Sequence, residues 1–272
     1  MAYTFKRFGQ MADDTPLSIQ SKINGTTLER YLSDDETKFL TLVVSGRGST
    51  NYRVESDDIF GRHGGLFLGS SLSTRIITIR ARVKADTNEA YRQVMSKLNL
   101  MMHRHEVHKL EFTDDEGYAF YGTCVRVEDE GEESNSQIVE IEFECHDPYK
   151  YTGTKSHTTT NAKDLVIDSD LPIIAEEISI TFPNSSDALD FTINNTSTDR
   201  RIRYQQSGTA SSNTIRIRQN KDYIGYIDSV NHIDDLNVRF SHFDEFTVAN
   251  ADQLVVTPAP TSITIKYRGV KL

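Results

Sequence analysis

The sequence predicts a mainly β protein with one α-helix, divided into two domains. Short segments of alternating apolar and polar residues recur along the chain, and a single stretch has the 3.6-residue period of a helix. The length of 272 residues exceeds the roughly 100–200 residues of one domain. We expect a β-sandwich-like N-terminal domain that carries the α-helix and a β-hairpin, followed by a C-terminal β-sandwich or jelly roll.

The first half begins with strands and then changes to the helical period. Phe39–Val44 is an apolar, β-branched run that stops at Gly46-Arg47-Gly48, and Arg75–Val83 alternates like a half-buried strand. From Asn88 to about His105, apolar residues fall on one helical face. We predict a capping box at the start of this helix, formed by Asp86 and Glu89.

Three further strands are expected after the helix, at Leu110–Phe112, Tyr118–Val127 and Gln137–Cys145. The third alternates strictly and places Cys145 in the core register, as an inert thiol. Its other face presents Glu140, Glu142 and Glu144 to solvent.

Residues 149–162 lack any periodicity and are predicted to be a linker between an N-terminal domain of residues 1–148 and a C-terminal domain of residues 163–272. Short alternating strands then recur every ~8–12 residues, as in a sandwich. The predicted strands are Glu177–Phe182, Leu189–Ile193, Arg201–Tyr204, Thr214–Arg218, Tyr223–Ile227, Leu236–Phe240, Leu254–Thr257 and Ser262–Tyr267.

The charge balance disfavours binding of nucleic acid through a basic face, because the chain carries a formal net charge of −10. The acidic block Glu128–Glu133 contributes much of this excess and is predicted to be a solvated hairpin tip. Met1–Asp14 lacks the apolar region of a secretory signal, and no segment is long enough to span a bilayer. We expect folding in a cytoplasm, with Cys124 and Cys145 as reduced thiols.

No catalytic, cofactor-binding or metal site is predicted. His103, His105 and His108 lie close in sequence, but His103 and His105 point to different helix faces, so they lack the spacing of a zinc site. The glycine clusters 46–48 and 61–65 lack the context of phosphate-binding or dinucleotide-binding loops. We interpret them as tight turns that present Arg47 and Arg62, either to a neighbouring subunit or simply to solvent.

The order and spacing of several short motifs carry a family resemblance. The chain is similar to the distal tail proteins of long, non-contractile-tailed phages that infect Gram-positive bacteria. His63 departs from the acidic residue expected in the Gly-Arg-x-Gly turn of that family. The motifs are Val44-Ser45-Gly46-Arg47-Gly48, Ile59-Phe60-Gly61-Arg62-His63-Gly64, Gly69-Ser70, Leu110-Glu111-Phe112-Thr113-Asp114-Asp115, Tyr121-Gly122, Phe143-Glu144-Cys145-His146-Asp147-Pro148-Tyr149-Lys150-Tyr151 and Gly225-Tyr226-Ile227-Asp228-Ser229.

The resemblance implies a structural protein of the virion tail tip, a baseplate hub made in the host cytoplasm. Such proteins form a hexameric ring, possibly paired with a second ring, between the major tail tube protein and a tail-associated fibre or lysin protein. Their N-terminal domains line a channel through which DNA passes without specific binding. The galectin-like C-terminal sandwich can hold receptor-binding or baseplate proteins. No membrane partner is implied.

Within this resemblance, we expect Arg47, Arg62, Glu140, Glu142 and Glu144 at assembly interfaces or on the channel wall, where carboxylates would repel DNA. One alternative is a carbohydrate-binding protein that recognises the host surface through its C-terminal sandwich. A second is a metal-dependent hydrolase built on the three clustered histidines.

Overall fold

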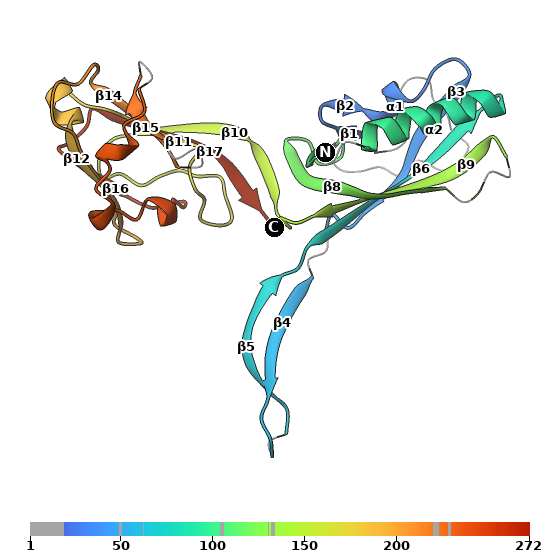
Figure 1. Ribbon diagram of the computed structural model, residues 1–272, viewed down its shortest axis with the longest axis horizontal. Helices are drawn as coiled ribbons and strands as arrows, with labels where there is room; N and C mark the ends of the chain where they lie inside the picture. The colour runs from blue at the N-terminus through green and yellow to red at the C-terminus, as the bar shows by residue number, and fades with distance from the viewer. Residues whose placement is uncertain are drawn as a thin grey trace. The chain divides into compact units, whose positions relative to one another are not determined.

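A computed structural model describes residues 19–48, 51–61, 63–103, 106–129, 131, 134–219, 223–227 and 230–272 (Figure 1). The chain divides into two compact units, residues 1–150 and 151–271. Residues 150–159 of the predicted linker form a strand, and the division gives no separate linker. Each unit is described by itself below.

The N-terminal unit is built on a sheet in the order β3-β6-β9-β8, and β8 continues into a second set in the order β8-β7-β1-β2. All neighbours are antiparallel. The long strand β8 serves both sets because its register shifts between Cys124 and Arg126. The strands are β1 (Ser21–Ile23), β2 (Thr26–Thr27), β3 (Thr37–Ser45), β6 (Arg75–Ala85), β7 (His108–Phe112), β8 (Tyr118–Asp129) and β9 (Ser136–Cys145).

Helix α2 (Asn88–Met102) covers one face of this sheet, and the one-turn helix α1 (Leu28–Tyr31) follows β2 (Figure 1). The buried face of α2 packs into a core with the inward residues of β6 and β9. The predicted capping box is wrong: the N-cap is Thr87, whose hydroxyl accepts a hydrogen bond from the backbone N–H of Ala90 at 3.1 Å. Thr87, one residue after Asp86, has the extended backbone that an N-cap requires.

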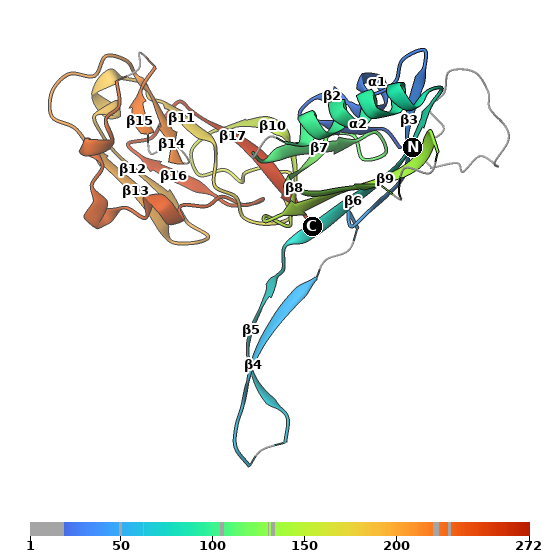
Figure 2. The same cartoon turned by 45° about the vertical axis from the view of Figure 1, so that its right-hand side comes forward.

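A two-stranded hairpin is inserted between β3 and β6. Its strands β4 (Tyr52–Asp58) and β5 (Gly65–Leu72) pair only with each other among the described residues. Figures 1 and 2 show this hairpin extending away from the body of the N-terminal unit. The sequence predicts a tight turn at the glycine cluster 61–65 but neither of these two strands.

The C-terminal unit is a sandwich of two antiparallel sheets, ordered β15-β14-β11-β17-β10 and β13-β12-β16. Aromatic rings fill its centre: the Phe191 ring lies 5.4 Å from Phe182 and 5.1 Å from Tyr204 between centroids. The strands are β10 (Lys150–Thr159), β11 (Glu177–Thr181), β12 (Asp190–Asn195), β13 (Arg200–Gln205), β14 (Thr214–Arg218), β15 (Tyr223–Tyr226), β16 (Leu254–Thr257) and β17 (Ser262–Lys271); the 3-10 helices are η1 (Ser185–Ala188), η3 (Ile233–Asp235), η4 (Val238–Phe240) and η5 (Phe243–Glu245).

Two sequence predictions for this half differ from the structure. The predicted linker contains strand β10, whose β-branched threonines favour extended backbone although most of its side chains are exposed or half-buried. The predicted strand Leu236–Phe240 is instead a bridge at Leu236 followed by η4. Its apolar residues Val238 and Phe240 are exposed, so their alternation does not reflect a buried face. No helix among the described residues has the length and apolar character to cross a membrane.

Candidate assembly interface

The hairpin is anchored at its base by a glycine and a buried arginine. Gly46 has φ +85°, and a Cβ at this position would lie 1.8 Å from the carbonyl oxygen of Ile76, so no larger side chain fits. The Arg75 side chain donates from Nε to the carbonyl oxygen of Pro148 at 2.7 Å, and from Nη1 to the carbonyl oxygens of Gly46 and Arg47. These contacts tie the start of β6 to the end of β3.

Arg47 forms an ion pair within its own chain. Its guanidinium donates to both carboxylate oxygens of Asp114, at 2.6 and 2.7 Å, and lies 4.7 Å above the ring of Phe112. The two charged side chains are only 17% and 18% exposed. This ion pair links the hairpin base to the turn after β7, and the interface role expected for Arg47 stays a prediction.

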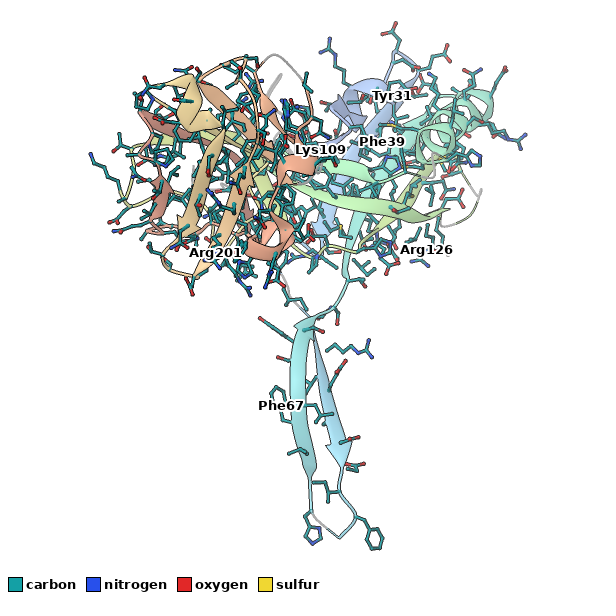
Figure 3. All side chains as sticks on the ribbon, turned by 60° about the vertical axis from the view of Figure 1, so that its left-hand side comes forward. Tyr31, Phe39, Phe67, Lys109, Arg126 and Arg201 are labelled. Carbon is teal, nitrogen blue, oxygen red and sulfur yellow. The ribbon has the colours of Figure 1, made fainter. Side chains whose placement is uncertain are left out.

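Arg62 lies outside the described residues. The described residues of the hairpin show which side chains it exposes. Each strand pair places its two side chains on the same face, and the register sets Tyr52, Val54 and Phe67 on one face. These three side chains are 64%, 61% and 65% exposed. Figure 3 shows Phe67 standing off the hairpin. At the turn, Phe60 is fully exposed.

Sequence reasoning missed this apolar face, because the glycine clusters were interpreted only as turns that present arginines. The alternation of Tyr52 and Val54 was an available signal, but serine and acidic residues interrupt it. An isolated two-stranded hairpin is marginally stable in water. Large apolar side chains that no part of the described chain covers mark this hairpin as an interaction surface.

Glu140, Glu142 and Glu144 share the solvent face of β9, as the alternation predicts, but that face is not uniformly acidic. Arg80 pairs with Glu140 at 3.2 Å, and Arg126 pairs with Glu142 at 3.2 Å. These arginines come from the two neighbouring strands, β6 and β8. Glu140 and Glu142 are therefore each paired with an arginine of a neighbouring strand.

The two thiols are free and unreactive in character. Cys145 is fully buried, and burial raises its pKa to about 11. Burial also raises the pKa of Cys124. Nucleophilic chemistry requires a thiolate, which these shifts disfavour at neutral pH.

The histidine cluster shows no metal-binding arrangement. His105 lies outside the described residues, and His108 is buried at the start of β7, where its Nδ1 lies 3.1 Å from the side-chain amide of Asn24. No group of three or more potential ligand side chains that could hold a metal is found in the described part of the chain.

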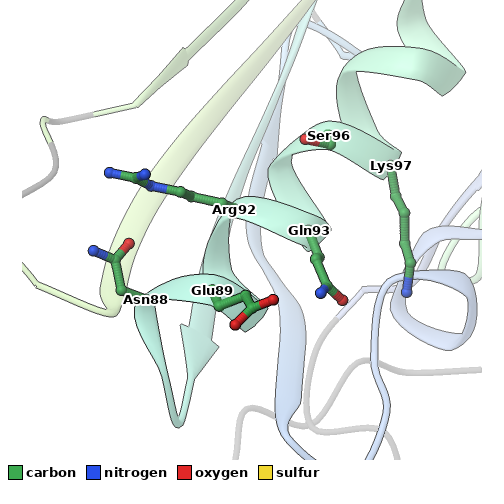
Figure 4. Close-up of a pocket in the computed structure, with 6 residues that line it drawn as sticks. All are labelled: Asn88, Glu89, Arg92, Gln93, Ser96 and Lys97. Carbon is green, nitrogen blue, oxygen red and sulfur yellow. The ribbon is translucent and has the colours of Figure 1, made fainter.

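A shallow hollow of about 540 Å³ runs along the exposed side of α2 (Figure 4). Its lining consists of long polar and charged side chains without a nucleophile paired to a base. The residues are Asn88, Glu89, Arg92, Gln93, Ser96 and Lys97.

Comparison with known proteins shows what the chain is similar to. Residues 26–145 match the family model of the phage tail protein RIFT-related domain. The chain is 27% identical over 149 residues to the distal tail protein of Bacillus phage SPP1; this stretch is 54% of the chain and spans only 59% of that relative.

The fold is also similar to a solved structure. The crystal structure of SPP1 Dit, described as a paradigm of the hub adsorption apparatus in phages that infect Gram-positive bacteria, superposes with a TM-score of 0.74 at 20% identity, covering 92% of this chain and 98% of that one. This likeness extends over both units. The chain is thus similar in sequence to a siphophage distal tail protein and in fold to a solved one, and its residues 26–145 match a phage tail domain family.

Proposed function

We propose that the protein is a non-enzymatic structural component of the phage tail tip that assembles into a hexameric ring. The observation that carries the proposal is the uncovered apolar face of the β4–β5 hairpin in a chain that matches a phage tail domain family. A heterologous contact, in which one surface meets a different surface of the next copy, closes into a ring when the rotation between copies permits. The hairpin and the sheet of the N-terminal unit are two such surfaces.

The ring would join the tail tube to a tail-associated fibre or lysin protein, and the C-terminal sandwich would anchor receptor-binding or baseplate proteins. The similarity to a distal tail protein and the likeness to a phage hub structure support this position. The protein would be made in the host cytoplasm and would function in the virion.

The central channel would pass DNA without binding it. The ion pairs of Arg80 and Arg126 support the β8–β9 side of the sheet as a candidate wall. Guanidinium groups already bound to carboxylates compete poorly for phosphates, and the carboxylates repel them. A charge-balanced wall replaces the repulsive acidic wall that the sequence alone suggested.

Light scattering behind size-exclusion chromatography tests the ring. We expect a mass of six chains, or of twelve if two rings associate. Negative-stain images of the same peak should show a central hole. A monomer at every concentration measured would contradict the proposal.

One exposed aromatic side chain favours the alternative of sugar recognition by the C-terminal sandwich. The Phe240 ring is 47% exposed, and the guanidinium carbons of Arg201 and Arg239 lie 5.8 and 5.7 Å from its centroid. Exposed aromatic rings can stack on sugar rings. Binding of the full chain to host cell-wall glycans, lost in Phe240→Ala, would establish this function; equal retention of both proteins would exclude it at this position.

A further inference from the structure

The outer face of the larger C-terminal sheet carries three cations around one nearly covered carboxylate. Glu177 on β11 points away from the core, because its neighbour Ile178 is fully buried on the inward face. Its carboxylate is shared by side chains of the two flanking strands, β14 and β17. They approach with Nε of Arg218 at 2.7 Å, Nζ of Lys266 at 3.5 Å and Nε of Arg216 at 3.8 Å. We call Arg216, Arg218 and Lys266 the cationic cluster.

The cationic cluster has more positive charge than its carboxylate can balance. Three cations share one carboxylate, and no other carboxylate of the described chain lies within ion-pair distance of them. The Glu177 side chain is 7% exposed, whereas those of Arg216, Arg218 and Lys266 are 35%, 36% and 50% exposed. A partner that approaches this face therefore meets the cations and not the carboxylate beneath them.

Contacts within the fold hold part of this cluster in place. The Ser179 hydroxyl donates to the Glu177 carboxylate at 3.1 Å, and Arg218 donates to it from Nε. The guanidinium carbon of Arg218 also lies 5.4 Å from the ring centroid of Tyr223. Side chains that are already fixed lose less conformational entropy when a partner binds. Because a guanidinium has five N–H donors, Arg218 keeps donors for a second carboxylate while its Nε stays on Glu177.

The surroundings of the cluster indicate a hydrophilic, anionic ligand. The other outward side chains of β11 and β14 carry hydroxyls, among them Thr181 and Thr214, whose oxygens lie 3.0 Å apart. Such a face offers charge and hydrogen bonds but little apolar contact. The chain as a whole has a formal net charge of −10, so a polyanion binds only where the local charge is positive.

Among anionic macromolecules, an acidic protein segment fits this face better than a nucleic acid. A nucleic acid draws most of its affinity from many phosphate contacts, which three cations around a carboxylate do not supply. Single strands also stack their bases on aromatic rings, but the Tyr223 ring already carries the Arg218 guanidinium. The cluster, by contrast, is already arranged around a carboxylate, that of Glu177.

We propose that the cationic cluster docks an acidic segment of a partner protein, whose carboxylates bind Arg216 and Lys266. Charge complementarity selects this occupant, because the segment supplies the negative charge that Glu177 alone does not. The inference rests on the proposed anchoring role of the C-terminal sandwich, and it names the sheet face and the charge of the partner.

Binding of a labelled oligo-glutamate peptide to the full chain, followed by fluorescence anisotropy, tests the docking. We expect saturable binding in about 0.02 M salt that weakens in about 0.3 M salt, because ions screen exposed charges. An oligo-glutamine peptide of the same length should not bind. A thymidine oligonucleotide with the same number of charges tests the nucleic-acid alternative and should bind more weakly than the peptide.

A charge-matched pair of variants locates the binding. The double variant Arg216→Gln, Lys266→Gln removes two cations of the cluster and leaves the hydrogen bond of Arg218 in place. We expect it to weaken peptide binding roughly tenfold, as two lost ion pairs at an exposed site would. The matched control, Arg200→Gln with Arg201→Gln, removes the same charge from β13 in the other sheet and should change binding less than about twofold.

Light scattering of the same samples keeps this docking separate from the ring. A six-chain mass without peptide binding overturns the docking and leaves the ring intact, whereas a monomer that binds the peptide overturns the ring alone. Equal weakening by the double variant and its control overturns docking at this cluster. Tighter binding of the oligonucleotide than of the peptide, lost in the double variant, overturns the acidic partner in favour of a nucleic acid.

Discussion

The hairpin and the C-terminal sandwich are built from the same kind of strand but differ in how they are covered. In the sandwich, Ile178 and Ile217 on β11 and β14 are fully buried because the sheet β13-β12-β16 lies over them. In the hairpin, Val54 and Phe67 remain more than half exposed. Alternation thus indicates which side chains require a cover, whereas it does not indicate which chain supplies it.

The largest expected effect on the free energy of unfolding concerns an aromatic side chain of the sandwich. Phe191→Ala removes a fully buried ring from the centre of the sandwich. We expect it to lower the free energy of unfolding of that unit by about 3–5 kcal/mol, as for large-to-small changes in a core. Denaturant unfolding followed by tyrosine fluorescence measures this loss, and a change below about 1 kcal/mol would contradict the described core.

The hairpin base should tolerate substitution less well than the turn between β1 and β2. Gly46→Ala combines a positive φ with a steric clash, whereas Gly25→Ala at φ +84° meets nothing within 4 Å. Strained backbone of this kind costs about 1–3 kcal/mol, so Gly46→Ala should exceed Gly25→Ala by the cost of the clash. Thermal melts of the two variants check this order, and equal melting temperatures would refute it.

A charged cluster on the solvent face of the sandwich should give a smaller, pH-dependent effect. Burial by itself raises the pKa of Glu177, but its hydrogen bonds from Arg218 and Ser179 and the nearby Lys266 outweigh burial and hold the pKa below its usual value. The stabilisation is therefore present above the unfolded pKa of about 4.3 and is lost as the pH falls through the lower folded pKa.

The measurement for this cluster is the free energy of unfolding between pH 7 and pH 3. Glu177→Gln should cost about 1–2 kcal/mol at pH 7, in line with hydrogen bonds to charged groups at a partly exposed site, and should flatten the acid limb. The matched control is Asp187→Asn, a half-buried carboxylate for which no ion pair is found among the described residues. An unchanged acid limb in Glu177→Gln would contradict the assigned role.

The smallest expected effect on monomer stability belongs to the hairpin. Phe67→Ala should change the free energy of unfolding by less than about 0.5 kcal/mol, because exposed side chains contribute little to folding. It should nevertheless weaken assembly, which light scattering at a series of concentrations measures. A variant that assembles like the parent would show that this apolar face has no partner.

The parts of the fold that the sequence predicts are those in which the alternating apolar face of an element is covered by the same chain. The strict alternation of β9 fixed the burial of Cys145 and the exposure of Glu142, and the helical period located α2. The bidentate pair of Arg47 with Asp114 escaped prediction because 67 residues separate them. The 3-10 helix η4 at Val238–Phe240 was predicted as a strand because alternation occurs in exposed turns as well as in strands.

The position of the hairpin and its length are set by different parts of the structure. Its base is fixed by the tight turn at Gly46 and by the Arg75 contacts, but none of these contacts depends on how far the strands extend. Side chains alternate faces, so residues can be added or removed in steps of two on each strand without turning the apolar face over. Hairpin length can therefore change by itself, while the sheet and its core stay as they are.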